Sequence, residues 1–149
     1  RRVQRNVEDV LLDGKLRGKP TLIVHGRADA LIPVNHASRA YYGAHRIAER
    51  RSAASYIEVT NAQHFDSFLS FPGYPERYVP LHVYLVRSLN AMHAHLTQGT
   101  ALPPSQVVRT VPRGVGAPAI TAANVPEWAL VPAEANRIGF EHRTLYVPD

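Results

Sequence analysis

The stretch TLIVHGRADALIPV, residues 21–34, decides how the rest of the sequence is interpreted. Its first five residues, 21–25, are mostly apolar and predict a buried β-strand. Gly26 then breaks the run, Asp29 follows, and Pro33 prevents any continuation of the strand. A carboxylate at the carboxyl end of a buried strand is either a turn residue or part of a functional site.

A helix and a second strand follow this first strand. Residues 35–51 carry alanines and larger apolar side chains along one helical stripe, with Asn35 as the expected N-cap. Residues 55–60, SYIEVT, alternate apolar and polar side chains, which is typical of a strand. The unit over residues 21–60 is therefore a βαβ crossover, whose two strands are parallel. Two strands are too few for a parallel sheet covered on both faces, so we expect an α/β fold with further strands upstream.

The remaining sequence predicts two more helices and an extended tail. The helices are expected over residues 3–12 and 81–96, where apolar side chains recur at helical spacing. Seven of the twelve prolines lie after residue 102, and no sustained period of either kind is present there. We therefore divide the chain into residues 1–98, the C-terminal part of an α/β domain, and residues 99–149, a Pro/Gly-rich tail that packs on it or extends from it. A short hairpin is expected within residues 136–149.

The composition narrows the functional classes. With 45% apolar and 19% charged residues, the chain is typical of a globular domain, and without cysteine it has neither disulfides nor thiolate metal sites. No apolar run approaches the ~20 residues of a membrane helix, so no membrane partner is expected. The net charge is +5, but the basic clusters are short and lack interleaved aromatics, which argues against nucleic acid as a partner. The basic charge is then either a solvated face of the protein or a means of steering an anionic small substrate to it.

Asp29 and His64 are the candidate catalytic residues. In open α/β sheets the site lies outside the carboxyl ends of the strands. Asp29 follows the first predicted strand, and His64, in TNAQHFDSF, follows the second. An acid and then a histidine after successive parallel strands are the last two members of the Ser…Asp…His order of α/β-hydrolases. His64 would take a proton from a serine hydroxyl, and Asp29 would accept the other ring N–H and stabilise the imidazolium.

Each of these residues also has a structural interpretation. Asp29 can cap the turn over residues 30–33, and His64 is one of eight histidines. Asp66 is a rival acid, but it lies two residues from the histidine and is better placed to shape the loop. Asp13 precedes the first strand, at the wrong end of the sheet. The occurrence of the pair on adjacent strand ends, in the hydrolase order, favours catalysis.

Neither a metal nor a cofactor is predicted. His93 and His95 lie on one predicted helix, where two residues of separation turn the rings roughly 200° apart. His25 and His36 have no evident third ligand. A metal site is therefore not expected, and no cofactor motif is present.

The nucleophile of the predicted triad is missing from the chain. No G-x-S-x-G pattern occurs, because Gly14 and Gly18, the only glycines four apart, enclose Leu16. The only methionine is Met92, and the first predicted helix begins at the start of the sequence. We therefore expect the chain to be a piece of a longer protein, whose preceding part brings the serine, the oxyanion hole and the missing strands. The chain alone should not catalyse by the triad route.

Four segments carry a resemblance to a known family: GKPTLIVHGRADALIPVNHASRAYY (18–42), SYIEVTNAQHFDSFL (55–69), FPGYPERYVPLHVYL (71–85) and GTALPPSQVVRTVPRG (99–114). They resemble the C-terminal third of the bacterial D-(-)-3-hydroxybutyrate oligomer hydrolases. The resemblance covers most of residues 10–126, and its later segments are more specific than the Asp and His motifs.

The resemblance implies an α/β-hydrolase fold and a serine esterase that cuts soluble 3-hydroxybutyrate oligomers to monomers, downstream of polyhydroxybutyrate depolymerase. Asp29 then matches the acid position and His64 the histidine position. Family members are generally exported, which implies a secreted or periplasmic protein. Because such a substrate is an ester with a terminal carboxylate, we hypothesise that Arg27, two residues before the acid, binds that carboxylate. The alternative is that Arg27 pairs with a nearby acid or faces solvent.

Two further functional interpretations stay open. A tannase- or feruloyl-esterase-like hydrolase of aromatic esters has a similar strand–Asp–Pro pattern. A non-catalytic binding module could keep the fold without the chemistry. A substrate panel separates the first from the oligomer hydrolase, and a serine elbow in the preceding part of the protein would argue against the second.

Overall fold

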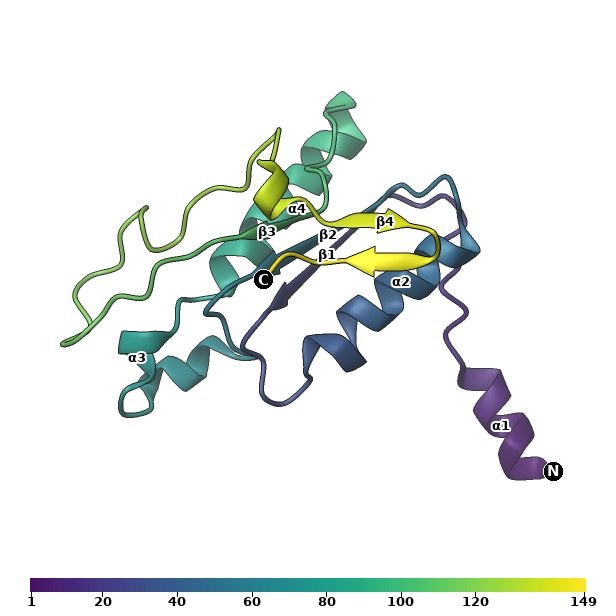
Figure 1. Ribbon diagram of the computed structural model, residues 1–149, viewed down its shortest axis with the longest axis horizontal. Helices are drawn as coiled ribbons and strands as arrows, with labels where there is room; N and C mark the ends of the chain where they lie inside the picture. The colour runs from purple at the N-terminus through teal and green to yellow at the C-terminus, as the bar shows by residue number, and fades with distance from the viewer.

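A parallel sheet of three strands lies at the centre of the computed structural model, which describes residues 1–149 (Figure 1). The strands are β1 (Thr21–Gly26), β2 (Ala54–Val59) and β3 (Gln106–Val108), in that order across the sheet. β1 and β2 pair from Thr21 opposite Ala54 to Gly26 opposite Val59. The parallel pairing that the crossover predicts is therefore confirmed.

The other elements connect or cover this sheet. The helices that the sequence predicts near residues 3–12, 35–51 and 81–96 all form, and so does the predicted hairpin near the C-terminus. These elements are the helices α1 (Arg2–Val10), α2 (Ser38–Ala48), α3 (Tyr74–Arg77) and α4 (His82–Gln98), the antiparallel strands β4 (Gly139–Glu141) and β5 (Thr144–Tyr146), and the 3-10 turns Val34–His36, Asp66–Ser70 and Glu134–Asn136.

The prediction that Asn35 caps the helix is wrong. Asn35 lies within the 3-10 turn Val34–His36, and α2 begins only at Ser38. In this turn the His36 N–H donates a hydrogen bond to the carbonyl of Pro33 at 2.9 Å. The three residues of the turn therefore precede the first residue of the α-helix. The Asn35 side chain instead accepts a hydrogen bond of 3.0 Å from Nη1 of Arg39.

The two faces of the sheet are covered by different layers. Alternate residues of β2 point to opposite faces, so Ile57 and Val59 pack with Tyr84 of α4, while Tyr56 packs with Tyr42 of α2. The β4–β5 hairpin lies on the α2 side, and Figure 1 shows it running across β1 and β2. Helix α2 and the hairpin thus contribute to one small core, and α4 covers the second core on the opposite face of the sheet.

The segment after residue 98 packs on this body through backbone and side-chain contacts. The Gln106 side chain and the Ala129 backbone exchange two hydrogen bonds of 2.8 Å. The Ile138 N–H donates to the carbonyl of Ser105 at 3.1 Å. The chain therefore returns to this edge of the sheet twice after β3, while the domain boundary between residues 98 and 99 stays a prediction.

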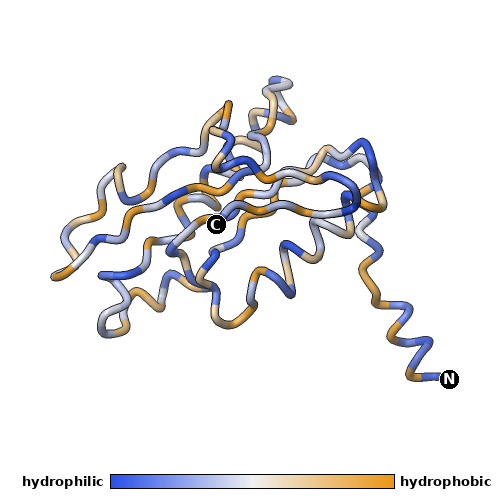
Figure 2. The backbone as a smooth tube through the Cα atoms, in the orientation of Figure 1, coloured by the Kyte–Doolittle hydropathy of each residue, from blue (hydrophilic) through white to orange (hydrophobic).

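Helix α1 contributes nothing to either core. None of its residues is buried, and its valines Val3, Val7 and Val10 are exposed. Figures 1 and 2 show the helix projecting from the sheet, with apolar and polar residues interspersed along it. None of the helices combines the length and the apolar character needed to cross a bilayer.

Candidate active site

Asp29 and His64 meet at the carboxyl edge of the sheet. Nδ1 of His64 lies 2.7 Å from Oδ2 of Asp29, a normal length for a charge-assisted hydrogen bond. Asp29 comes from the turn after β1, and His64 comes from the loop after β2. The side chain of Asp29 is 2% exposed, whereas that of His64 is 26% exposed. The structure thus brings the two predicted residues together, with the imidazole on the side that solvent can reach.

The Asp29 carboxylate is fixed from several directions. Its Oδ1 accepts hydrogen bonds from the backbone N–H groups of Leu31 at 2.9 Å and Ile32 at 2.8 Å. Burial raises the pKa of Asp29, but hydrogen bonds from Ile32, His64, His25 and Leu31 outweigh it and hold the pKa below its usual value. Asp29 therefore caps its turn with one oxygen and binds the imidazole, as an anion, with the other.

The loops that carry the pair are joined directly to each other. The Ala28 N–H donates to the carbonyl of Ala62 at 3.1 Å, and the Ala30 N–H donates to Oε1 of Gln63 at 3.2 Å. Gly26 makes this approach feasible, because a Cβ there would stand 2.7 Å from the carbonyl carbon of Ala62. The distance between the acid and the histidine is therefore supported by contacts between the two loops and not by the two side chains alone.

His25 is a third side chain at the site, and the sequence did not predict it as one. Its Nε2 lies 3.0 Å from Oδ2 of Asp29, the same oxygen that binds His64, and its side chain is 13% exposed. The sequence interpretation considered His25 only as a metal ligand. The available signal was its position four residues before the acid, at the end of the strand that leads to the site.

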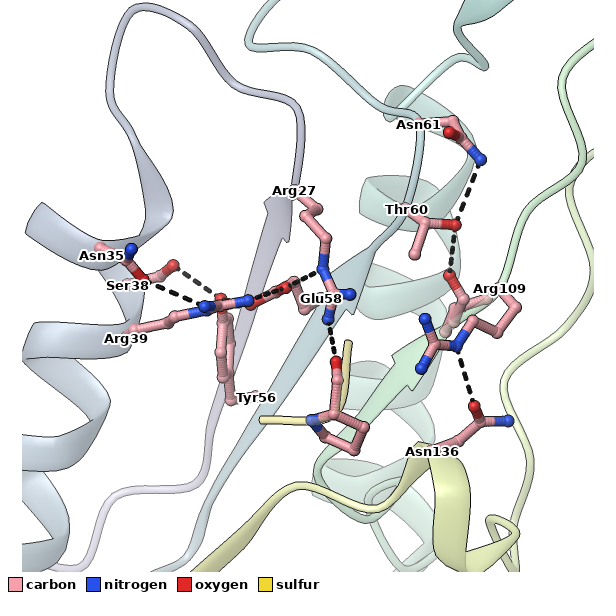
Figure 3. A network of polar contacts seen from close by, with 12 residues as sticks. Arg27, Asn35, Ser38, Arg39, Tyr56, Glu58, Thr60, Asn61, Arg109 and Asn136 are labelled. Atoms are coloured by element: carbon pink, nitrogen blue, oxygen red, sulfur yellow. Dashed lines mark hydrogen bonds and ion pairs between the residues drawn. The ribbon is translucent and has the colours of Figure 1, made fainter. Parts of the chain in front are cut away.

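Arg27 is held by the buried carboxylate of Glu58. Its Nε donates to Oε1 of Glu58, and its Nη2 donates to the carbonyl of Pro148 at 2.6 Å. Glu58 is fully buried and also binds Arg39 and the Tyr56 hydroxyl, as Figure 3 shows. The alternative of an ion pair with a nearby acid is thus observed, while a role of Arg27 in binding substrate stays a prediction.

The rival acids have other partners. Asp66 accepts hydrogen bonds from the backbone N–H groups of Leu81 at 2.7 Å and His82 at 3.0 Å, which satisfies donors at the start of α4. Asp13 is exposed and pairs with Lys15 at 3.5 Å. Neither carboxylate contacts His64.

An apolar cavity of about 480 Å³ opens beside His64 on the α4 side of the sheet. The ring of Phe65 stands edge-on to the imidazole with 4.2 Å between centroids. The residues that line the cavity are Val24, His64, Phe65, Asp66, Leu81, His82 and Leu85. No group of three or more His, Cys, Asp and Glu side chains is arranged to hold a metal ion. The site can thus hold and move a proton next to a space suited to an apolar group.

The geometry defines an acid–histidine pair at the carboxyl edge of a parallel sheet, and comparison with known proteins identifies the family. The chain belongs to the family described as 3HB-oligomer hydrolase (3HBOH), whose model matches residues 1–149. It is 55% identical over 157 residues to the D-(-)-3-hydroxybutyrate oligomer hydrolase of Paracidovorax citrulli, an alignment that covers 100% of this chain and 22% of that protein.

A second relative shows a similar identity and coverage. The hydrolase of the same name from Cupriavidus necator is 55% identical over 145 residues, which cover 93% of this chain and 20% of that protein. The chain thus spans about a fifth of the length of these relatives. No solved structure matches the chain.

Proposed function

We propose that the chain supplies the acid and the base of a serine hydrolase that cleaves D-3-hydroxybutyrate oligomers to monomers. The observation that carries the proposal is the 2.7 Å contact between His64 Nδ1 and Asp29 Oδ2. The family membership and the names of the relatives supply the substrate class. In this proposal the parallel sheet is the C-terminal part of an α/β-hydrolase fold, and the preceding part of the protein supplies the serine nucleophile and the oxyanion hole.

The contact sets the tautomer that the chemistry needs. Because Asp29 is ionised and can only accept, His64 must carry its proton on Nδ1, which leaves Nε2 free to take the serine proton. The serine oxygen then attacks the ester carbonyl carbon, and collapse of the adduct expels the hydroxyl end of the next unit, which receives the proton from Nε2. Water repeats the two steps on the acyl-enzyme and releases the acid, with the proton returning to the serine.

The cavity beside His64 supports the substrate class. A 3-hydroxybutyrate unit carries a methyl group next to its ester oxygen, and the cavity offers Val24, Phe65 and Leu85 beside the imidazole. Apolar contact there would orient the ester without occupying the Nε2 lone pair that takes the serine proton.

The test is turnover of hydroxybutyrate trimers by the full-length protein and its variants. We expect Asp29→Asn to lower kcat by up to about 10⁴-fold, the effect of the same change in the serine-protease template, where the wrong tautomer results. His64→Gln should be at least as damaging, because it removes the base. Asp13→Asn, which alters an exposed carboxylate that pairs only with Lys15, is the matched control and should leave kcat unchanged. Full activity in either site variant would refute the proposal.

The aromatic-ester alternative is tested by the same protein. A panel of 3-hydroxybutyrate oligomers and esters of gallate and ferulate should show kcat/KM higher for the oligomers by orders of magnitude. Preference for the aromatic esters would assign the site to the tannase-like alternative. Inactivity towards every ester, in a protein whose preceding part lacks a serine elbow, would favour the non-catalytic module.

A further inference from the structure

We propose that His25 is a positioning residue that holds the Asp29 carboxylate in the orientation that His64 requires. The inference rests on the proposed function and extends it to a residue outside the Ser…Asp…His order. Nε2 of His25 lies 3.0 Å from Oδ2 of Asp29, and Nδ1 of His64 lies 2.7 Å from the same oxygen. One carboxylate oxygen therefore serves two imidazoles.

The acceptor capacity of Asp29 is fully used in this arrangement. A carboxylate offers about four acceptor positions, two on each oxygen. Oδ1 accepts from the N–H groups of Leu31 and Ile32, and Oδ2 accepts from His25 and His64. Three of the four donors belong to the strand and turn that carry Asp29 itself. His64 is the only donor from another loop.

The backbone donors alone do not fix the second oxygen. Both of them bind Oδ1, so they resist rotation of the carboxylate through that oxygen alone and leave Oδ2 without a donor from the turn. The hydrogen bond from His25 holds Oδ2 as well, at the position where it accepts from His64. His25 is well placed for this task, since it lies in β1, where its backbone pairs with Glu58 in the sheet.

The hydrogen bond also identifies the ring nitrogen of His25 that donates. Asp29 is ionised, so Nε2 of His25 must be the donor, and the ring is oriented by the strand and not by the substrate. In metal sites, partners that orient the metal ligands account for one to two orders of magnitude in affinity or activity, and we expect an effect of the same size for a donor that orients Asp29. His25 touches neither the substrate nor the serine in this scheme and acts only through Asp29.

The test compares three substitutions of His25 in the full-length protein. His25→Leu removes the donor, and His25→Asn keeps an amide that is too short to reach Oδ2. His25→Gln places its amide nitrogen near the position of Nε2 and can still donate. We expect the Leu and Asn variants to lower kcat by about 10- to 100-fold with KM within about twofold, and the Gln variant to recover to within about threefold of wild type.

A spectroscopic measurement separates positioning from general support of the fold. The proton between His64 and Asp29 should give a downfield NMR resonance, which His64→Gln removes and thereby assigns. We expect His25→Asn to shift or broaden it and His25→Gln to restore it. An unshifted resonance and wild-type kcat in His25→Asn would overturn the inference. Equal losses of kcat in the Asn and Gln variants would overturn it too, because rescue depends on the donor.

The outcomes distinguish this inference from the proposed function. If Asp29→Asn and His64→Gln are inactive while His25→Asn is fully active, the triad stands and the role of His25 fails. If the Asp29 and His64 variants are themselves fully active, the proposed function fails, and the role of His25 fails with it. The Gln variant keeps the test decisive even where His25→Leu does not fold.

Discussion

Nη2 of Arg39 lies 2.6 Å from Oε1 of Glu58, an ion pair that ties helix α2 to the middle strand of the sheet. Nε of the same arginine lies 2.8 Å from the other carboxylate oxygen, so the contact is bidentate. Arg27 reaches Glu58 from the turn after β1, and the Tyr56 hydroxyl donates to Glu58 at 2.6 Å (Figure 3). A fully buried carboxylate is stable only with such partners, so this cluster joins α2, β2 and the turn after β1.

The first prediction concerns the stability that depends on Glu58. Glu58→Ala should lower the free energy of unfolding by about 3–5 kcal/mol, because it leaves two partly buried guanidinium groups without their shared carboxylate. The measurement is denaturant unfolding of the full-length protein. Glu134→Ala is the control, since Glu134 is 89% exposed and pairs with Arg137 only at 3.3 Å. Equal shifts of the unfolding midpoint at the two positions would contradict the prediction.

The second prediction is a loss of stability on acidification. Burial raises the pKa of Glu58, but hydrogen bonds from Arg39, Tyr56 and Arg27 outweigh it and hold the pKa below its usual value of 4.5. Since the pKa is lower in the folded state, the stabilisation is complete above about pH 4.5 and is lost as the pH falls through the folded-state pKa. Asp29 acts in the same direction.

Unfolding midpoints measured between about pH 3 and pH 7 check this dependence. Wild type should lose stability in the lower part of that range, and Glu58→Gln should be less stable at neutral pH with a flatter profile. Parallel profiles for the two proteins would show that Glu58 does not carry the acid sensitivity.

Much of the sheet and of the pair could be predicted because each depends on a local pattern. The apolar run of β1, the helical stripe of α2 and the alternation of β2 are encoded within their own residues. Their order makes the two strands parallel, and parallel strands bring their carboxyl ends to one edge. The meeting of Asp29 and His64 follows from that topology and needs no knowledge of distant contacts.

The features that escaped prediction depend on distant partners. β3 has only three residues, and it forms because β2 offers a free edge to the proline-rich segment. Glu58 occupies a polar position in an alternating strand, which predicts exposure, yet it is fully buried because two arginines from other elements neutralise it. His25 escaped for the same reason, since its role depends on the path of the turn after its strand.

The third prediction concerns the close approach at Gly26. Gly26→Ala should destabilise the protein by about 1–3 kcal/mol, because the added Cβ would press on the Ala62 backbone and force a shift. The shift would move the loop that carries His64 away from Asp29, so kcat should fall as well. Gly43→Ala is the control: its Cβ would meet nothing closer than 4.0 Å, and alanine favours helix α2 by about 0.5–1 kcal/mol. Wild-type kcat and stability in Gly26→Ala would contradict the prediction, because they would show that the protein accommodates a Cβ between Gly26 and the Ala62 backbone.

The fourth prediction separates the two roles open to Arg27. Its guanidinium binds Glu58 and the carbonyl of Pro148, so Arg27→Ala should lower the free energy of unfolding and free the C-terminal segment. If Arg27 also binds the terminal carboxylate of an oligomer, KM should rise for free-acid oligomers and stay unchanged for their methyl esters. Arg39→Ala is the matched control, because it removes the other arginine of Glu58 without touching β1. Equal KM for free acids and methyl esters in both variants would leave Arg27 with the structural role alone.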